Sequence, residues 1–238
     1  MLHTSFKSTD TLTEQFPCPY FRDGREASVE YIVADAFSGK EFHLFLSKGY
    51  RRLGRIFYKN ICASCSECKP IRIEVEKFSP GKSSRRTLRV NKDLQVRITS
   101  PPEVTPEKCA LYNHYVISKH GESHAAPDSS IPVVCSMHYG YDHIIEMNYS
   151  LGSTLLGVGI VDEGEDCLSS NYFYYDTDFL DRRPGIFSIL QEIRLAKRMG
   201  KRYYYLGFFI ENNPAMSYKK DFRPNQILVN DEWVEFER

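Results

Sequence analysis

The sequence predicts a mixed α/β (α+β) fold, and three stretches of its C-terminal half carry that prediction. Two apolar runs, residues 155–162 and 168–176, are joined by a short acidic turn, which is typical of a β-hairpin. Apolar residues then recur at helical spacing over 184–200, where a Pro-Gly pair and a glycine mark the two ends. The apolar run 203–210 indicates a buried strand.

The order hairpin, helix and strand favours an N-acetyltransferase-like (GNAT-like) acyltransferase domain, although other α+β arrangements share it. The Pro101-Pro102 pair marks the clearest break in the chain. We therefore expect an N-terminal cysteine-rich, basic region over residues 1–100 and a C-terminal GNAT-like domain over residues 101–238.

Shorter patterns predict the elements of the N-terminal region. Residues 1–17 are polar and predict a loose arm, and 42–48 form a short apolar stretch. A strand is expected over 55–61. Apolar and charged residues alternate over 71–76, which predicts a second strand with one polar face. Residues 80–84 are rich in Pro, Gly and Ser and predict a break.

The C-terminal half begins with a predicted helix. Thr105 and Pro106 supply a capping hydroxyl and a proline for the first helical position, and Gly121 is a suitable end. Residues 120–130 predict a loop, and the histidines within it lack a metal-ligand spacing. The acidic turn at 162–166 is expected to be solvated.

The formal net charge of the 238 residues is zero, but the charges are unevenly distributed. Residues 48–97 hold fourteen Lys or Arg and four Asp or Glu, so this segment carries +10 and the remainder −10. Such asymmetry points to a polyanionic partner. Aromatic residues lie among the cations, which suits an RNA end or an acidic ligand. A solvated basic surface is the alternative.

Three of the seven cysteines form C-x-x-C-x-x-C at Cys62, Cys65 and Cys68. A tight loop brings neighbouring sulfurs within reach of one metal ion, and Cys18 is the leading candidate for a fourth ligand. We therefore expect zinc or an iron–sulfur cluster on these four thiols. Unliganded thiols are the alternative.

Motifs for other chemistries are absent from the sequence. There is no P-loop, no H-E-x-x-H and no G-x-S-x-G, so we expect neither a nucleotide cofactor nor an obvious nucleophile. No secretory signal is visible, and the longest apolar run is far short of a membrane span. With an odd number of cysteines, these features favour a cytoplasmic protein without a membrane partner.

Several longer blocks are more specific than any of these patterns. They include GYRRLGRIFYKNICASCSECKPIRI (49–73), SSRR (83–86), LYNHYVISKHG (111–121) and YYYLGFFIENNPAMSYKKDFRP (203–224). Together they resemble the aminoacyl-tRNA–protein transferases of the N-degron pathway, which comprise arginyltransferases and bacterial leucyltransferases. The resemblance covers nearly the whole chain, and its block pattern is closer to the bacterial leucyl branch.

The resemblance implies transfer of an amino acid from charged tRNA to the α-amine of proteins with N-terminal Asp or Glu, which marks them for degradation. The expected donor is Leu-tRNA, with Arg-tRNA as the alternative. In some eukaryotic members, paired N-terminal cysteines help to bind an iron–sulfur cluster or another metal. Here Cys18 matches the first of that pair, whereas Phe21 stands at the second position.

The resemblance also suggests where the site lies. The C-terminal signature is expected to line the catalytic cleft through Tyr205, Gly207, Tyr218 and Lys219. The two tyrosines could equally be core aromatics. Arg72, Arg85 and Arg86 are the expected partners of the acceptor carboxylate, with contact to tRNA phosphates as the alternative. Arg51 and Arg52 are expected to bind either the acceptor carboxylate or the tRNA.

The expected reaction needs little acid–base assistance. An aminoacyl ester is activated, and an α-amine with a pKa of about 7.7–8.0 is partly neutral near pH 7. Positioning and stabilisation of the oxyanion are then the main tasks of the enzyme. Two alternatives stay open: an acyl-CoA N-acetyltransferase, for which Gly185 alone would represent the glycine-rich loop, and a metal-containing RNA-binding protein without activity.

Overall fold

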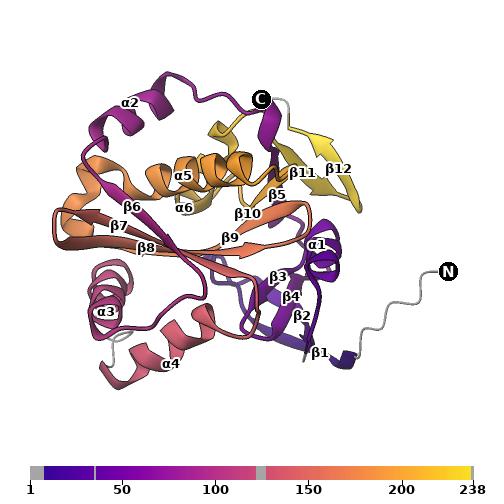
Figure 1. Cartoon of the computed structure of the whole chain (residues 1–238). Coiled ribbons are helices and arrows are strands. Elements are labelled where there is room, and N and C mark those ends of the chain that lie inside the picture. The colour runs from indigo at the N-terminus through magenta and orange to yellow at the C-terminus, as the bar shows by residue number, and fades with distance from the viewer. Residues whose placement is uncertain (1–7, 35, 122–126, 237–238) are drawn as a thin grey trace.

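The computed structural model describes residues 8–34, 36–121 and 127–236, and it has two β-sheets flanked by helices (Figure 1). The larger sheet has eight strands in the order β12-β11-β5-β10-β9-β8-β7-β6. Their bounds are β5 (Lys69–Glu74), β6 (Gln95–Thr99), β7 (Ile144–Leu151), β8 (Thr154–Glu163), β9 (Cys167–Tyr175), β10 (Tyr203–Phe209), β11 (Gln226–Val229) and β12 (Glu232–Glu235). The expected α+β fold class is confirmed.

The smaller sheet belongs entirely to the N-terminal region. Its strands are β1 (Ser8–Pro17), β2 (Glu26–Ala34), β3 (Arg51–Leu53) and β4 (Ile56–Asn60), in the order β1-β2-β4-β3. The loose arm expected over residues 1–17 is wrong for its described part, because β1 pairs with β2 at Ser8 and from Thr11 to Pro17. Most of the described side chains of β1 are exposed. The strand therefore lacks the alternation of apolar and polar residues from which it could have been predicted.

Helices lie on both faces of the large sheet (Figure 1). Their bounds are α1 (Gly39–Ser47), α2 (Lys82–Val90), α3 (Pro106–His120), α4 (Pro127–His138), α5 (Pro184–Arg198) and α6 (Pro214–Ser217), with short 3₁₀ helices η1 (Val75–Lys77), η3 (Thr177–Arg182) and η4 (Tyr218–Asp221). Figure 1 shows α2 and α5 on one face of the sheet and α3 and α4 on the other.

The predicted elements of the C-terminal half are confirmed. The Thr105 hydroxyl accepts a hydrogen bond from the Lys108 amide at the start of α3. Strands β8 and β9 form the antiparallel hairpin, α5 begins at Pro184, and β10 runs parallel to β9. The predicted loop at 120–130 is wrong at its two ends, because α3 extends to His120 and α4 begins at Pro127, while residues 122–126 lie outside the described part of the chain.

Other N-terminal predictions are corrected by the structure. The stretch 42–48 lies mostly in helix α1, which a reciprocal capping box between Ser38 and Glu41 begins. The break expected at 80–84 is instead the start of α2. Strand β5 is present between β10 and β11, but its polar face is not exposed: Arg72 is only 8% exposed, because the rings of Tyr203 and Trp233 cover its guanidinium.

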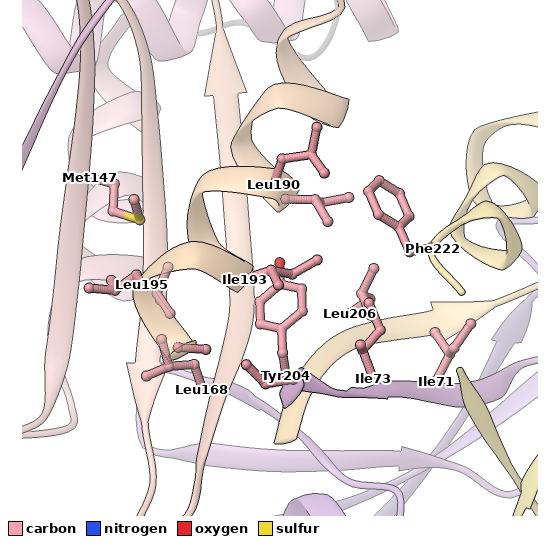
Figure 2. Packing of buried hydrophobic residues seen from close by; sticks show 14 of the residues in the cluster. Ile71, Ile73, Met147, Leu168, Leu190, Ile193, Leu195, Tyr204, Leu206 and Phe222 are labelled. Atoms are coloured by element: carbon pink, nitrogen blue, oxygen red, sulfur yellow. The ribbon is translucent and has the colours of Figure 1, made fainter. Parts of the chain in front are cut away.

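The main core lies between α5 and the large sheet. Figure 2 shows Leu190 and Ile193 of α5 facing Tyr204 and Leu206 of β10 and, beside them, Ile73 of β5. Each fully buried aliphatic side chain of this kind contributes roughly 1.5–3 kcal/mol. Strands β5 and β6 precede residue 100 and yet belong to the large sheet, so the N-terminal segment is built into the fold that positions the site.

Candidate active site

The two parallel strands of the large sheet, β9 and β10, separate towards their C-terminal ends. Their pairing extends from Cys167–Tyr203 to Ser169–Tyr205 and then stops. The pairing of β9 with β8 shifts register around Asn171, and that of β10 with β5 shifts between Tyr205 and Gly207. In α/β sheets, ligands bind outside the carboxyl ends of the parallel strands, so this divergence is a natural binding position.

A cavity of about 820 Å³ opens where β9 and β10 diverge, and we call it the cleft. The start of α5, the segment of α6 and η4, helix α3 and parts of the N-terminal region also contribute to its wall. From the two strands, it is lined by Ser170, Asn171, Tyr172, Phe173, Tyr175, Leu206, Gly207 and Phe208.

Arg51 of β3 reaches into the gap between the two strands. Its guanidinium donates to the carbonyls of Ser170 at 2.6 Å and Asn171 at 3.2 Å, and to the hydroxyl of Ser169 at 3.3 Å. The cation thus satisfies carbonyl groups at the point where pairing with β10 ends. A side chain in place of Gly207, whose φ is +83°, would put its Cβ only 3.1 Å from the Arg51 guanidinium carbon.

Lys219 of η4 lies in the same wall and is almost fully buried. Its Nζ donates to the carbonyl of Phe208 at 2.8 Å. Burial, assisted by the positive charge of Arg51, lowers the pKa of Lys219 to about 7. An amine with such a pKa can both accept and donate a proton near neutral pH.

The ionisable side chains of opposite sign are unequally represented in the cleft, which among the described residues is lined by basic residues and by no acidic ones. Its lining residues, all in the described part of the chain, include no Asp or Glu and four cations: Arg51, Lys119, Arg183 and Lys219. Apolar side chains lie among them, notably Ile186, Ile189, Leu206, Phe208 and Met216. The cleft therefore suits an anionic ligand that also carries an uncharged apolar group.

The structure brings together four of the residues predicted for the site. Arg51, Gly207, Tyr218 and Lys219 all line the cleft. Burial raises the pKa of the Tyr218 phenol to about 12, so this hydroxyl stays protonated as a donor. Tyr205 does not line the cleft, and its position agrees with the alternative of a core aromatic.

Arg72 is also outside the cleft. Its guanidinium lies between the rings of Tyr203, at 3.9 Å, and Trp233, at 4.2 Å, and donates to the Tyr205 hydroxyl at 3.2 Å. A further bond to the Gln226 side chain completes this setting. Arg72 is thus occupied in a buried aromatic cluster that joins β5, β10 and β12.

Arg52 forms an internal ion pair. Its guanidinium donates to both carboxylate oxygens of Asp162, at 2.6 and 2.9 Å, and both side chains are fully buried. The expectation of a solvated acidic turn is therefore wrong for Asp162, because this turn folds against β3. Arg85 and Arg86 lie on α2, exposed and outside the cleft lining.

The four candidate metal ligands, Cys18, Cys62, Cys65 and Cys68, line a second cavity of about 460 Å³. The Ser28 amide donates to Cys62 Sγ and the Arg25 guanidinium to Cys65 Sγ, each at 3.3 Å. Such donors favour sulfur that carries negative charge, as in a soft-metal site.

In the described part of the chain, the four sulfur atoms of this cysteine cavity do not form a group in which three or more lie within 4.8 Å of one another. Among the described residues, the group of three candidate ligand atoms lying within 4.8 Å of one another is that of His114, Asp176 and Asp178. The cysteine cavity shares Tyr20, Tyr58 and Phe208 with the cleft. Metal binding at the cysteines stays a prediction.

Arg183 and Asn171 are among the cleft residues that the sequence did not predict for the site. Arg183 precedes the first proline of α5, in the left-handed conformation with φ of 56°. Asn171 interrupts the apolar run of β9, and this polar interruption was the available signal. Neither position shows from sequence alone that it lines a cavity at the ends of two diverging strands.

Comparison with known proteins decides the family. Residues 16–86 match the family model "Arginine-tRNA-protein transferase, N terminus", and residues 107–229 match "Arginine-tRNA-protein transferase, C terminus". The chain belongs to the arginine-tRNA–protein transferase family. The resemblance noted from the sequence blocks and the assignment to the transferases are confirmed.

Within this transferase family, the chain is similar to proteins named aspartate/glutamate leucyltransferase. That of Shewanella sp. (strain MR-7) is 37% identical over 93% of this chain and 92% of its own length. That of Saccharophagus degradans is 32% identical over 94% and 95%, respectively.

The transferase chain is also similar to a solved structure, that of FemX. The match has a TM-score of 0.50 and covers 92% of this chain and 86% of the FemX chain at 8% identity, which is a likeness of fold alone. With the order of elements, it confirms the expected GNAT-like fold. No helix in the described part of the chain has the length and apolarity needed to cross a membrane.

Proposed function

We propose that this transferase moves leucine from Leu-tRNA to the α-amine of proteins that begin with Asp or Glu, marking them for degradation. The observation that supports leucine as the transferred amino acid is the positive charge of the residues that line the cleft. An arginyl group would place a further cation beside Arg51, Lys119 and Arg183 with no lining carboxylate to pair with it. A leucyl side chain needs only the apolar positions, and the names of the relatives support the same donor.

Both substrates of this reaction offer anionic groups to the cleft. The tRNA carries phosphates next to its aminoacylated end, and the acceptor carries the carboxylate of its first residue. Three of the five N–H groups of Arg51 donate to Ser169, Ser170 and Asn171, so within the described part of the chain two are left for that carboxylate.

The chemical step exchanges an ester for an amide. The acceptor nitrogen attacks the ester carbonyl carbon, a C–N bond forms, and the bond to the ribose oxygen breaks. The nitrogen loses one proton and the ribose oxygen gains one. Neutral Lys219, held beside the cleft by Phe208, accepts the first proton and returns it to the ribose oxygen.

The four thiols at Cys18, Cys62, Cys65 and Cys68 are proposed to hold zinc or an iron–sulfur cluster, since they line one cavity and two of them accept N–H donors. Cys65→Ser is expected to lower the metal content of the purified protein, and also its visible absorption if the metal is an iron–sulfur cluster, whereas Cys135→Ser leaves both unchanged. Metal-free protein with full activity would contradict this role.

A cytoplasmic location is part of the proposal. The seven cysteines, all in the described part of the chain, are free thiols, which suits a reducing compartment that also contains charged tRNA.

A donor–acceptor assay tests the function. The protein is incubated with peptides that begin with Asp, Glu or Asn and with Leu-tRNA, Arg-tRNA or acetyl-CoA, and each peptide is weighed by mass spectrometry. We expect addition of leucine to the Asp and Glu peptides alone, because the Asn side chain has the same shape without the charge. Addition of arginine would overturn the donor, and no addition from any donor would overturn the transferase.

A further inference from the structure

Helix α2 carries a dense positive charge. Its nine residues include Lys82, Arg85, Arg86 and Arg89, all exposed, and no acidic residue. The Arg85 guanidinium donates to the carbonyl of Pro80, and no cation of this helix forms an ion pair with an acid in the described part of the chain. The nearby Asp93 is already paired with Arg182, so α2 presents an uncompensated cationic surface.

Helix α2 is also tied to the rim of the cleft. The cleft residue Arg183 donates to the hydroxyls of Ser83 at 2.7 Å and Thr87 at 3.2 Å. The Asn91 side chain, at the end of α2, donates to the carbonyl of Arg182 at 2.7 Å. These bonds hold α2 next to the first turn of α5, where Pro184 and Gly185 also line the cleft.

We propose that the exposed surface of α2, formed by Lys82, Arg85, Arg86 and Arg89, binds phosphates of the tRNA acceptor arm, and that the aminoacylated end enters the cleft past Arg183. This inference rests on the proposed function and decides between two partners for these arginines. The α-amine of the acceptor must react inside the cleft, and the carboxylate belongs to the same first residue, whereas Arg85 and Arg86 lie outside the cleft lining.

The dimensions and aromatic neighbours of the surface agree with RNA. A nine-residue helix is about 13 Å long, which is the axial length of a few nucleotides of one strand. Beyond Arg183, the cleft wall carries Tyr115 and Tyr175, with the Lys119 ammonium 5.7 Å from the centre of the Tyr175 ring. Aromatic rings beside cations are suited to stack the unpaired bases at a tRNA 3′ end.

The test is the salt dependence of tRNA binding. The double variant Arg86→Gln with Arg89→Gln removes two charges from α2. The matched control, Lys40→Gln with Arg198→Gln, removes two exposed helical cations from α1 and from the far end of α5. Binding of uncharged tRNA is measured at several salt concentrations, and the thermal midpoint of each variant verifies folding.

If α2 binds phosphates, the slope of log Kobs against log[salt] falls by about 1.4–1.8 in the α2 variant, at about 0.7–0.9 per lost contact. The KM for Leu-tRNA rises and the KM for the Asp peptide stays constant, and the control changes neither. An unchanged slope would overturn the proposal, as would a rise in peptide KM alone, which indicates an acidic protein at α2. Because the binding of uncharged tRNA does not require transfer, the salt dependence tests the role of α2 even if the protein lacks the proposed activity.

Discussion

The guanidinium of Arg51 lies directly against the backbone of Gly207. A Cβ at position 207 would approach the guanidinium carbon to 3.1 Å and one of its nitrogens to 3.2 Å. Arg51 of β3, in the small sheet, thus contacts β10 where its pairing with β5 shifts register. Its guanidinium also binds carbonyls of β9, so it occupies the space between the two diverging strands. The N-terminal region thus contributes a residue without which the cleft has no central cation.

Gly207→Ala should displace Arg51 and impair transfer. The added methyl group collides with the guanidinium, and the φ of +83° is strained for any residue with a Cβ. We expect kcat/KM for the Asp peptide to fall about tenfold or more, which corresponds to ~1.4 kcal/mol. Gly152→Ala is the matched control, because its φ is +59° but nothing lies within 4 Å of the added Cβ. Equal activity losses in both variants would mean that backbone strain, not Arg51, is responsible.

Lys219 should impose a pH dependence on transfer. With a pKa of about 7, it is protonated below pH 7 and cannot accept a proton there, so the rate should rise through pH 7. The neighbouring charge that helps to lower this pKa is that of Arg51. Lys219→Arg keeps the charge but removes the titration, and we expect a pH–rate profile without that inflection and a loss of about 100-fold in kcat.

The control for Lys219 is its neighbour Lys220, which is outside the cleft lining. Lys220→Met should keep both the rate and the inflection. Titration of the acceptor amine contributes to every profile, so the comparison is made between variants with one peptide. An inflection that persists unchanged in Lys219→Arg would assign it to the acceptor amine instead.

Glu146 should govern acid stability. Burial acts to raise the pKa of this carboxyl, but hydrogen bonds from His138, Lys108 and Asn148 outweigh it and lower the pKa from 4.5 to about 2. Since the pKa is lower in the folded state, the stabilisation is complete above pH 4.5 and is lost as the pH falls towards 2. Glu146→Gln should flatten this part of the pH–stability curve and cost roughly 3–5 kcal/mol at pH 7, because Lys108 keeps a buried charge.

Chemical denaturation between pH 2.5 and 7 measures this effect. Glu107→Gln, on the exposed surface of α3, is the control and should leave the curve unchanged. A curve for Glu146→Gln as steep as that of the parent protein would place the acid-sensitive group elsewhere.

The buried pair Arg52–Asp162 should support stability more than chemistry. Asp162→Asn leaves a buried guanidinium without its counter-ion and is expected to cost about 3–5 kcal/mol. Calorimetry should record a fall of roughly 6–20 °C in the thermal midpoint. Glu165→Gln changes an exposed carboxylate of the same turn and should shift the midpoint by less than about 2 °C. Comparable shifts for the two variants would contradict a special role for the buried pair.

Much of the fold follows from local patterns. The capped helix at Thr105, the β8–β9 hairpin, the α5 helix and the buried β10 strand each carry a periodicity or an end signal that does not depend on distant residues. The polar strand β1 and the helix α2 lack such a signal. Their place depends on pairing or packing with partners elsewhere in the chain, namely β2 and α5.

The sequence by itself determined the family, the C-terminal order of elements, the excess of positive charge over residues 48–97, and the choice of Gly207, Tyr218 and Lys219 as candidates for one cleft. Only the tertiary structure sorted the five candidate arginines: Arg51 into the cleft, Arg52 and Arg72 into buried contacts, and Arg85 and Arg86 onto an exposed helix. The physical reason is that a charge pattern records only the number and sequence spacing of cations. Whether each one meets Asp162, an aromatic ring, a strand carbonyl or solvent is decided by which strands lie side by side.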